Sequence, residues 1–298
     1  MGEGSEARAI VTDFWGMVLN PSSIDRLVHS IIGCWLTGAF LVISICAFYL
    51  LKKRHVEFAR TSMKISLIVA FISLLLQLIS ADSTAQGVAQ NQPEKLAAIE
   101  GVYKTKERTP MTLFGYVDAK EQKVHGIKIP SLLSFLVYHD FTTPVPGLEN
   151  FPEDEWPNAP VVFQTYHIMI YMWGAMFLVT LFAVIFWKRK SLERAKWTLR
   201  FLVLSVVCPH IANETGWMTA EMGRQPWVVY KLLRTTAGVS KSIIPAYVVG
   251  SIIMFIVIYT LLLFLFLYLL HRKIMHGPED HNKDDLIYRN IYQEKKSV

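Results

Sequence analysis

The chain has 298 residues, 52% of them hydrophobic, and carries a formal net charge of +6. This composition, with a positive mean hydropathy, excludes an ordinary soluble domain and indicates a polytopic membrane protein. The lysines and arginines concentrate beside apolar segments, as membrane orientation requires, so we expect no nucleic-acid partner.

Apolar runs long enough to cross a bilayer predict an all-α membrane protein with five transmembrane helices. Residues 1–26 form a polar lead-in, and residues 27–79 hold the first pair of spans. Residues 80–160 form a loop that is too long to be a mere connector, so we expect it to be functional. Residues 161–272 hold the third to fifth spans, the fourth of which, about 197–222, is interrupted by Pro209. Residues 273–298 form a charged tail.

Basic residues cluster in the short loops that follow the first, third and fifth spans. Cytoplasmic loops of membrane proteins are enriched in lysine and arginine, so we assign these three loops to the cytoplasm. The amino terminus and the loop 80–160 are then extracytoplasmic, and the carboxy terminus is cytoplasmic. The loops concerned are Lys52-Lys53-Arg54, Lys188-Arg189-Lys190 and His271-Arg272-Lys273.

Two carboxylates lie at the polar end of the fourth span. His210, Glu214, Trp217 and Glu221 follow i, i+4, i+7, i+11 spacing and share one face of a helix. Ionisable groups at this depth need a partner, a cavity or a cofactor, unless the helix end simply reaches interfacial water. Glu221 could ligate iron, carry protons or cap the helix, with Arg224 as its natural partner. Glu214 is a candidate for a proton path.

Two further residues could bind haem iron. His29 and Met169 lie near the outer ends of the first and third spans, and a histidine and a methionine commonly form an axial pair. The spacing equally fits an interfacial histidine and a packing methionine. In the long loop, Lys95 and Glu100 flank Leu96-Ala97-Ala98-Ile99, and their spacing alone indicates solvated surface charges.

Several ordered motifs resemble subunit I of the cytochrome bd-type quinol oxidases. Gly223-Arg224-Gln225-Pro226-Trp227 is similar to the most distinctive signature of that family, and Gly216-Trp217 and Ala220-Glu221 precede it as they do there. The resemblance extends over most of the chain, through Val28-His29, Lys95-Leu96-Ala97-Ala98-Ile99-Glu100, Thr112-Leu113-Phe114-Gly115, Lys128-Ile129-Pro130, Pro144-Val145-Pro146-Gly147-Leu148 and Ile168-Met169.

The resemblance implies a role for each of these positions. His29 and Met169 would ligate a low-spin haem b, and Glu221 would ligate a high-spin haem b. Trp217 and Arg224 would line the high-spin haem, while Lys95 and Glu100 would belong to the quinol site. His167 stands where the family carries an arginine close to the low-spin haem, so it is included among the cofactor-binding candidates.

The family's subunit I normally begins with about four further membrane spans, which carry the histidine of a third haem, haem d or a third haem b. Nothing in this sequence corresponds to them, so the chain resembles the carboxy-terminal half of a split or truncated subunit I. The implied partners are the amino-terminal half on a separate chain, subunit II, membrane lipid and quinol. The implied location is a prokaryotic inner membrane.

The expected function is a haem-binding subunit of a respiratory quinol oxidase, inactive without its partner subunits, that oxidises quinol at the outer loop. Electrons would pass toward an oxygen-reducing haem that a partner completes. Two alternatives remain open: a quinol-oxidising cytochrome with another electron acceptor, and a haem-free proton or ion transporter that uses Glu214 and Glu221.

Overall fold

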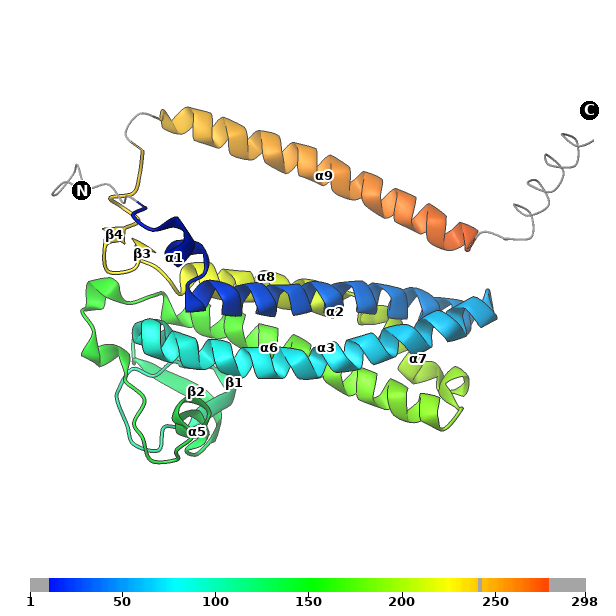
Figure 1. Cartoon of the computed structure of the whole chain (residues 1–298), viewed down its shortest axis with the longest axis horizontal. Helices are drawn as coiled ribbons and strands as arrows, with labels where there is room; N and C mark the ends of the chain where they lie inside the picture. Colours follow the sequence, from blue (N-terminus) through cyan, green and yellow to red (C-terminus); the bar gives the residue numbers. More distant parts are fainter. Residues whose placement is uncertain (1–10, 241–242, 279–298) are drawn as a thin grey trace, which may run out of the picture.

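The computed structural model describes residues 11–240 and 243–278 of the chain, and helices account for most of the described part (Figure 1). The helices are α1 (Phe14–Val18), α2 (Pro21–Lys52), α3 (Val56–Asn91), α4 (Pro93–Glu100), α5 (Leu132–Tyr138), α6 (Ala159–Lys188), α7 (Lys196–Leu204), α8 (Val207–Met222) and α9 (Pro245–His276). The strands are β1 (Met111–Asp118), β2 (Lys123–Ile129), β3 (Trp227–Val229) and β4 (Leu233–Arg234). Short 3-10 turns η2 (Leu148–Asn150), η3 (Glu153–Glu155) and η4 (Leu192–Arg194) complete the elements.

Four helices in the described ranges are long and apolar enough to cross a membrane, namely α2, α3, α6 and α9. Helix α2 is capped at its start by Asn20, whose side chain accepts a hydrogen bond from the Ser23 N–H, and Pro21 lies in its first turn. At its other end the capping residue Lys53 adopts the left-handed conformation with φ 53°. The predicted polar lead-in therefore already contains α1 and the first turns of α2.

The fourth predicted span is two helices rather than one. α7 ends at Leu204 and α8 begins at Val207. The helix is therefore broken at Ser205 and Val206, and not at Pro209 as predicted. Pro209 lies in the first turn of α8, where a backbone N–H has no helical partner, and is therefore tolerated. Both helices pack along α2 and α6. A count of five crossings stays a prediction.

The apolar interior is divided into two clusters. One fills the space between α2, α3, α6 and α7 and contains the fully buried Phe40, Ile43, Leu67 and Met176. The other surrounds α4 and includes Leu96 and Val145 from the segment that follows α3. Helices α2, α3 and α6 thus pack in one cluster with α7, and the long loop forms its own core at one end of these helices.

Helix α9 lies apart from the other long helices (Figure 1), with the apolar side chains along its length exposed. Its last turn contacts the end of α2, where Tyr49 donates a hydrogen bond to the Ile274 carbonyl at 2.7 Å. It also contacts the loop that follows α2, where Arg54 donates to the Met275 carbonyl at 2.8 Å. Most of the predicted tail, residues 279–298, lies outside the described residues.

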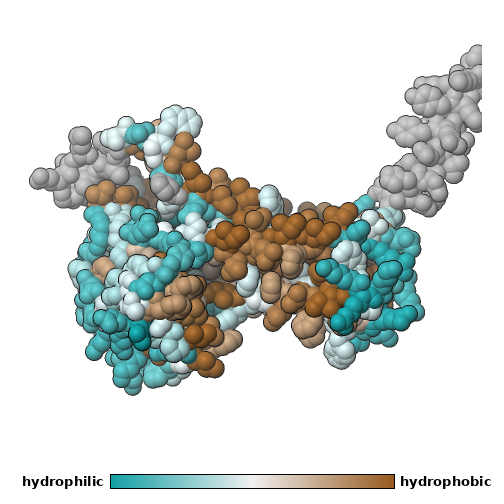
Figure 2. All heavy atoms as spheres, turned by 60° about the horizontal axis from the view of Figure 1, so that its bottom comes forward, coloured by the Kyte–Doolittle hydropathy of each residue, from teal (hydrophilic) through white to brown (hydrophobic). Residues whose placement is uncertain are grey.

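The predicted loop 80–160 is a folded unit. α3 continues through the polar segment Ser80–Asn91, and α4, the antiparallel hairpin β1–β2 and α5 follow. Leu113 is skipped in the pairing of β1 with β2, which makes a bulge between Thr112 and Phe114. The prediction of a helical protein is confirmed for most of the described residues, and the hairpins β1–β2 and β3–β4 are departures from it. Figure 2 shows an apolar band between two polar ends, with this unit in one of them.

Gly101 closes α4 in the left-handed conformation with φ +66° and lies directly against the hairpin. A Cβ at this position would collide with Cγ2 of Val124, so Gly101→Ala combines an unfavourable backbone conformation with a clash. We expect this substitution to lower the free energy of unfolding by about 1 kcal/mol or more.

Thermal denaturation of the solubilised protein would measure this effect, at about 2–4 °C per kcal/mol. Gly174→Ala is the matched control, because a Cβ added at Gly174 meets nothing within 4 Å. Equal melting temperatures for the two variants would contradict the packing of the hairpin on Gly101.

Candidate functional site

Every residue of the short helix α4 after Pro93 is buried, although three of them are ionisable. Glu94 is 3% exposed, and Lys95 and Glu100 are each 5% exposed. The interpretation of Lys95 and Glu100 as solvated surface charges is therefore wrong. A charge removed from water requires a partner, and each of these three side chains meets a different element.

Lys95 reaches the carboxy-terminal end of α8. Its Nζ donates a hydrogen bond to the Ala220 carbonyl at 3.1 Å, where a helix terminus attracts a cation. A Cβ on Gly223 would lie 3.0 Å from Cε of Lys95, so this glycine allows the close approach. Burial lowers the pKa of Lys95 to about 8, with Arg26 and Arg224 acting in the same direction and Glu221 opposing them.

Glu100 points toward α6, where Tyr166 forms a hydrogen bond to its carboxyl group. Burial raises the pKa of Glu100 to about 7, and the bond from Tyr166 opposes the rise. Its Oε2 atom is buried without a hydrogen-bond partner. Glu100 and Lys95 thus point to different helices, as their five-residue separation predicts.

Glu94 is bound by the hairpin β3–β4. The Tyr230 hydroxyl donates to Oε2 of Glu94 at 2.8 Å, and Nζ of Lys231 lies 3.8 Å from Oε1. Lys231 also pairs with Glu155 in the turn before α6. Both Lys231 and Arg234 lie over the ring of Trp227. The hairpin is therefore attached to α4 and to the start of α6.

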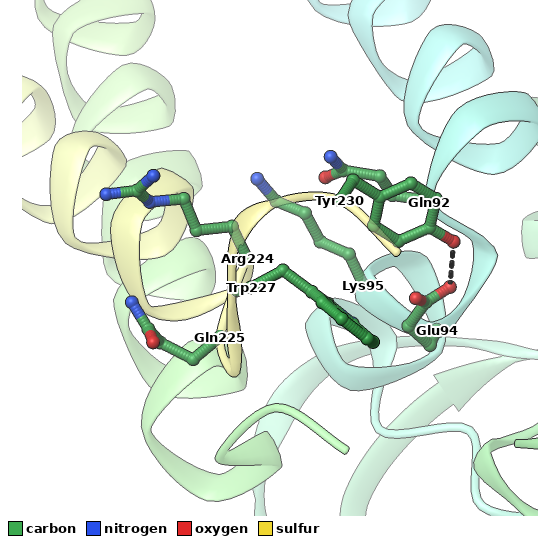
Figure 3. Close-up of a pocket in the computed structure, with 8 residues that line it drawn as sticks. Gln92, Glu94, Lys95, Arg224, Gln225, Trp227 and Tyr230 are labelled. Atoms are coloured by element: carbon green, nitrogen blue, oxygen red, sulfur yellow. Dashed lines mark hydrogen bonds between the residues drawn. The ribbon is translucent and has the colours of Figure 1, made fainter. Parts of the chain in front are cut away.

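A narrow recess lies between the amino-terminal end of α4 and the segment after α8 (Figure 3). Charged and amide side chains surround it: Gln92, Glu94, Lys95, Arg224 and Gln225, together with Trp227 and Tyr230. Oε1 of Gln92, Nε of Arg224 and Nε1 of Trp227 are buried without hydrogen-bond partners in the described structure.

The predicted face of α8 is present. Glu221 and Arg224 form an ion pair in which Nη2 lies 2.7 Å from Oε2, and both side chains are about half-buried. Trp217 is 63% exposed, and His210 and Glu214 are exposed too. This face therefore turns away from the helices against which α8 packs.

His29 is half-buried on α2 and contacts two residues of α3. Its Nδ1 atom is 3.2 Å from the Ser80 hydroxyl and its Nε2 atom is 2.7 Å from the amide nitrogen of Gln77. Both ring nitrogens of His29 therefore lie within hydrogen-bond distance of a polar side chain of α3. The Oε1 atom of the same glutamine is buried without a partner.

Met169 on α6 lies against α8 at Gly216, where an added Cβ would be 2.8 Å from the sulfur. A contact between α6 and α3 fixes the level of Met169 along the helices. Trp173, one turn farther along α6, donates to the Leu74 carbonyl of α3 at 3.3 Å, and Leu74 is one turn from Gln77.

On the other side of α8, a Cβ on Gly33 of α2 would lie 2.8 Å from the Asn213 side chain. Asn213 and Gly216 are one turn apart, as are Gly33 and His29. Helix α8 runs antiparallel to α2 (Figure 1), so the turn from Asn213 to Gly216 and the turn from Gly33 to His29 lead toward the same end of the helices. The packing therefore brings His29 and Met169 to one level of the group α2, α3, α6 and α8.

His167 is 1% exposed and directed at backbone oxygens. Its Nδ1 atom lies 2.8 Å from the Phe163 carbonyl, and its Nε2 atom lies 2.9 Å from the Thr112 carbonyl of β1. The ring also stacks on Phe163 with centroids 3.9 Å apart. A neutral imidazole carries one N–H, so the ring donates to one of these carbonyls while its other nitrogen lies beside the second.

Sequence reasoning did not single out Gln77, Glu94, Tyr166 or Tyr230. Gln77 contacts His29, and Tyr166 contacts Glu100. Tyr230 contacts Glu94, which precedes Lys95 in α4. An amide within an apolar span was a visible signal for Gln77. For the two tyrosines no local signal exists, because their partners are distant in sequence.

Residues 2–278 match the model of the family described as cytochrome bd terminal oxidase subunit I. The chain is 33% identical to a cytochrome bd ubiquinol oxidase subunit 1 of Bacillus subtilis over 94% of its own length and 62% of the relative's. It is 35% identical to a putative cytochrome bd menaquinol oxidase subunit I of the same organism over 75% of this chain and 52% of that one.

A solved structure of bd oxidase from Geobacillus thermodenitrificans has the same fold, with a TM-score of 0.79 and 27% identity over 89% of this chain and 61% of that one. The chain thus spans between about half and two thirds of the length of the relatives it matches. The expectation that it is the carboxy-terminal half of a split subunit stays a prediction.

The raised pKa of Glu100 predicts a pH-dependent stability. Its neutral form is favoured in the folded chain, so its contribution is full below the ordinary pKa of about 4.5 and is lost as pH rises to about 7. Glu100→Gln, which stays neutral, should therefore gain stability relative to the unchanged protein between these pH values and keep a constant advantage above them.

Melting temperatures of the two proteins across this pH range measure the difference. Glu107→Gln, an exposed position in the same loop, is the control and should show no such trend. A difference between Glu100→Gln and the unchanged protein that does not vary with pH would contradict a neutral buried carboxyl.

Proposed function

Because the chain belongs to the cytochrome bd terminal oxidase subunit I family, we propose that it is a haem-binding subunit of a membrane quinol oxidase. In this role it oxidises quinol beside α4 and passes electrons through b-type haems toward an oxygen-reducing haem, of d or b type, that a partner completes. The observation that carries the proposal is the common level of His29 and Met169 within one helix group.

The chemistry of His29 and Met169 fits a low-spin haem b. Ser80 would orient the ring of His29 through Nδ1, so that Nε2 would bind iron. Gln77, whose amide lies 2.7 Å from Nε2, would move aside. On α6, the missing side chain of Gly216 leaves space for the Met169 sulfur. When bound, haem supplies one-electron redox chemistry at its iron.

The carboxylate of Glu221 fits a ligand of the high-spin haem b. Arg224 forms an ion pair with Oε2, which leaves Oε1 for iron. Trp217 lies on the same exposed face of α8 and would line the haem. Glu214, a further turn along that face, is proposed as part of a proton path.

Glu100 and Lys95 are proposed to act on quinol from α4. A carboxyl group with a pKa of about 7 can accept a proton from quinol and release it at neutral pH. The hydrogen bond from Tyr166 fixes the position of the carboxyl group while it holds the negative charge. Lys95 retains its proton at pH 7 and can donate a hydrogen bond to a quinol oxygen.

We further propose that the subunit works in a prokaryotic inner membrane with the end of the spans that carries α4 outside. Subunit II and the remaining part of subunit I, on this or a separate polypeptide, would cover the exposed apolar side chains of α9 and the outward face of α8. α7 and α8 would together make the fourth crossing, and α9 the fifth. The His29, Met169 and α4 roles would be the same in a quinol-oxidising cytochrome with another acceptor, and quinol-dependent oxygen uptake distinguishes the two.

Reduced-minus-oxidised absorption spectra of the purified protein test the haem sites. His29→Ala and Met169→Leu should each remove the low-spin b signal, because each variant lacks one of the two side chains that would hold the iron. Met172→Leu, a methionine at a neighbouring position of α6, is the matched control and should keep the signal. Retention of the low-spin spectrum in either test variant would refute that residue as a ligand.

Lys95→Ala should raise the KM for quinol at least several-fold while the haem spectra stay unchanged, because the group that contacts the substrate is removed and the ligands are not. Steady-state oxygen uptake with a soluble quinol measures this in the assembled oxidase. Lys104→Ala, an exposed lysine of the same loop, is the control. Unchanged quinol kinetics would show that Lys95 serves the packing of α8 alone.

A further inference from the structure

One face of the β1–β2 hairpin is apolar and exposed, although the hairpin lies in a segment that is otherwise polar. Phe114 pairs with Ile127 and Tyr116 pairs with His125, so these side chains and Ile129 project from the same face. Phe114, Tyr116 and Ile127 are 56%, 59% and 65% exposed. The opposite face carries Val117 and Val124 and packs on Gly101 of α4.

The side chains on the exposed face change in character along the hairpin. The pair nearest α6 is apolar, Phe114 with Ile127, and the next pair is aromatic, Tyr116 with His125. The last pair before the turn is charged, Asp118 with Lys123. This order from apolar through aromatic to charged is the order that a membrane interface selects along its normal.

Contacts with α6 place the hairpin at a definite depth. The Tyr171 hydroxyl donates to the Leu113 carbonyl at 2.8 Å, and its ring stacks on Phe114 with centroids 4.9 Å apart. Tyr171 precedes Lys188, at the basic end of the span, by 17 residues, which is about 26 Å along the helix at 1.5 Å per residue. Because the hydrocarbon core is about 30 Å thick, β1 begins at or within its boundary.

Backbone groups at this depth need hydrogen-bond partners, because lipid supplies none. The bulge leaves Leu113 outside the strand pairing, and Tyr171 binds its carbonyl. His167 lies beside the neighbouring Thr112 carbonyl at 2.9 Å. Tyr171 of a membrane span thus satisfies the carbonyl that the bulge leaves unpaired, and His167 packs against the neighbouring one.

We propose that the face formed by Phe114, Tyr116, Ile127 and Ile129 is a lipid-contacting surface that lies in the boundary layer of the bilayer. His167 and Tyr171 hold it at that depth. Figure 2 turns this side forward and shows apolar side chains on the polar end, adjoining the apolar band of the spans. A bilayer is the partner that fits, because the apolar face continues that band and its charges lie at the far end of the hairpin.

A lipid-contacting hairpin would have a consequence for the proposed quinol site, although the hairpin does not require that site. The face that packs on Gly101 lies next to Glu100, so the hairpin stands between lipid and the proposed proton acceptor. A lipid-soluble reductant that diffuses in the bilayer would meet the hairpin first.

Spin-label accessibility in lipid vesicles tests the surface directly. The full chain, with the subunits that purify with it, would carry Ile127→Cys in a background of Cys34→Ser and Cys208→Ser, which leaves the buried Cys46. We expect the ratio of collisions with oxygen to collisions with a water-soluble nickel chelate to be several-fold higher at position 127 than in a Lys128→Cys control. Lys128 is the next residue of the strand, on its opposite face.

Equal ratios at 127 and 128 would place the face in water and overturn the proposal. Exclusion of both reagents from 127 would show that protein covers it and would overturn it equally. Phe114→Cys, across the strand pair from Ile127, gives a second measurement if the first variant fails to assemble. Haem spectra identical to those of the parent protein confirm assembly in each case.

Discussion

The burial of three ionisable side chains on one eight-residue helix is the constraint on which the rest of this end of the molecule depends. A buried charge without a partner is costly, and the partners of Glu94, Lys95 and Glu100 come from the β3–β4 hairpin, α8 and α6. None of these elements can shift without exposing or isolating one of the charges. α4 therefore links the loop between α3 and α6 to α6 and α8, which carry the proposed haem ligands Met169 and Glu221. A site on α4 is thus held at a fixed position relative to these ligands.

Small residues let the helices approach closely enough for these contacts to form. Gly216 makes space for Met169, and the Thr219 hydroxyl donates to that of Thr165 at 2.8 Å between the same two helices. Within membranes, helix association relies on such close packing because apolar side chains gain little by leaving lipid. The positions of Met169 and Tyr166 therefore depend on the contact between α6 and α8, although neither residue is local to the end of α8 in sequence.

Length and hydropathy in the sequence were sufficient to locate α2, α6 and α9, because crossing a bilayer demands a long apolar run. The same criterion ended the second span at residue 79, since hydropathy records contact with lipid and the helix continues in polar residues to Asn91. The β1–β2 hairpin was missed because its turn lacks the usual glycine or asparagine, and Gln122 takes the positive φ of 51° instead. The importance of Lys95 and Glu100 came from family motifs, while spacing alone pointed to the surface. Their partners on α6 and α8 depend on tertiary packing that no local pattern contains.

The two ring nitrogens of His167 explain why this position can differ from the arginine expected there. Imidazole is short and planar, so it fits beneath the hairpin, stacks on Phe163 and lies within hydrogen-bond distance of the carbonyls of Phe163 and Thr112. A guanidinium group at this position would carry an obligatory charge and five N–H donors. Two carbonyls do not satisfy five donors, so an arginine would need a further anionic partner such as a haem carboxylate. With histidine, the same turn of α6 holds β1 instead, and the level of the hairpin is set by the helix that presents Met169 two residues later.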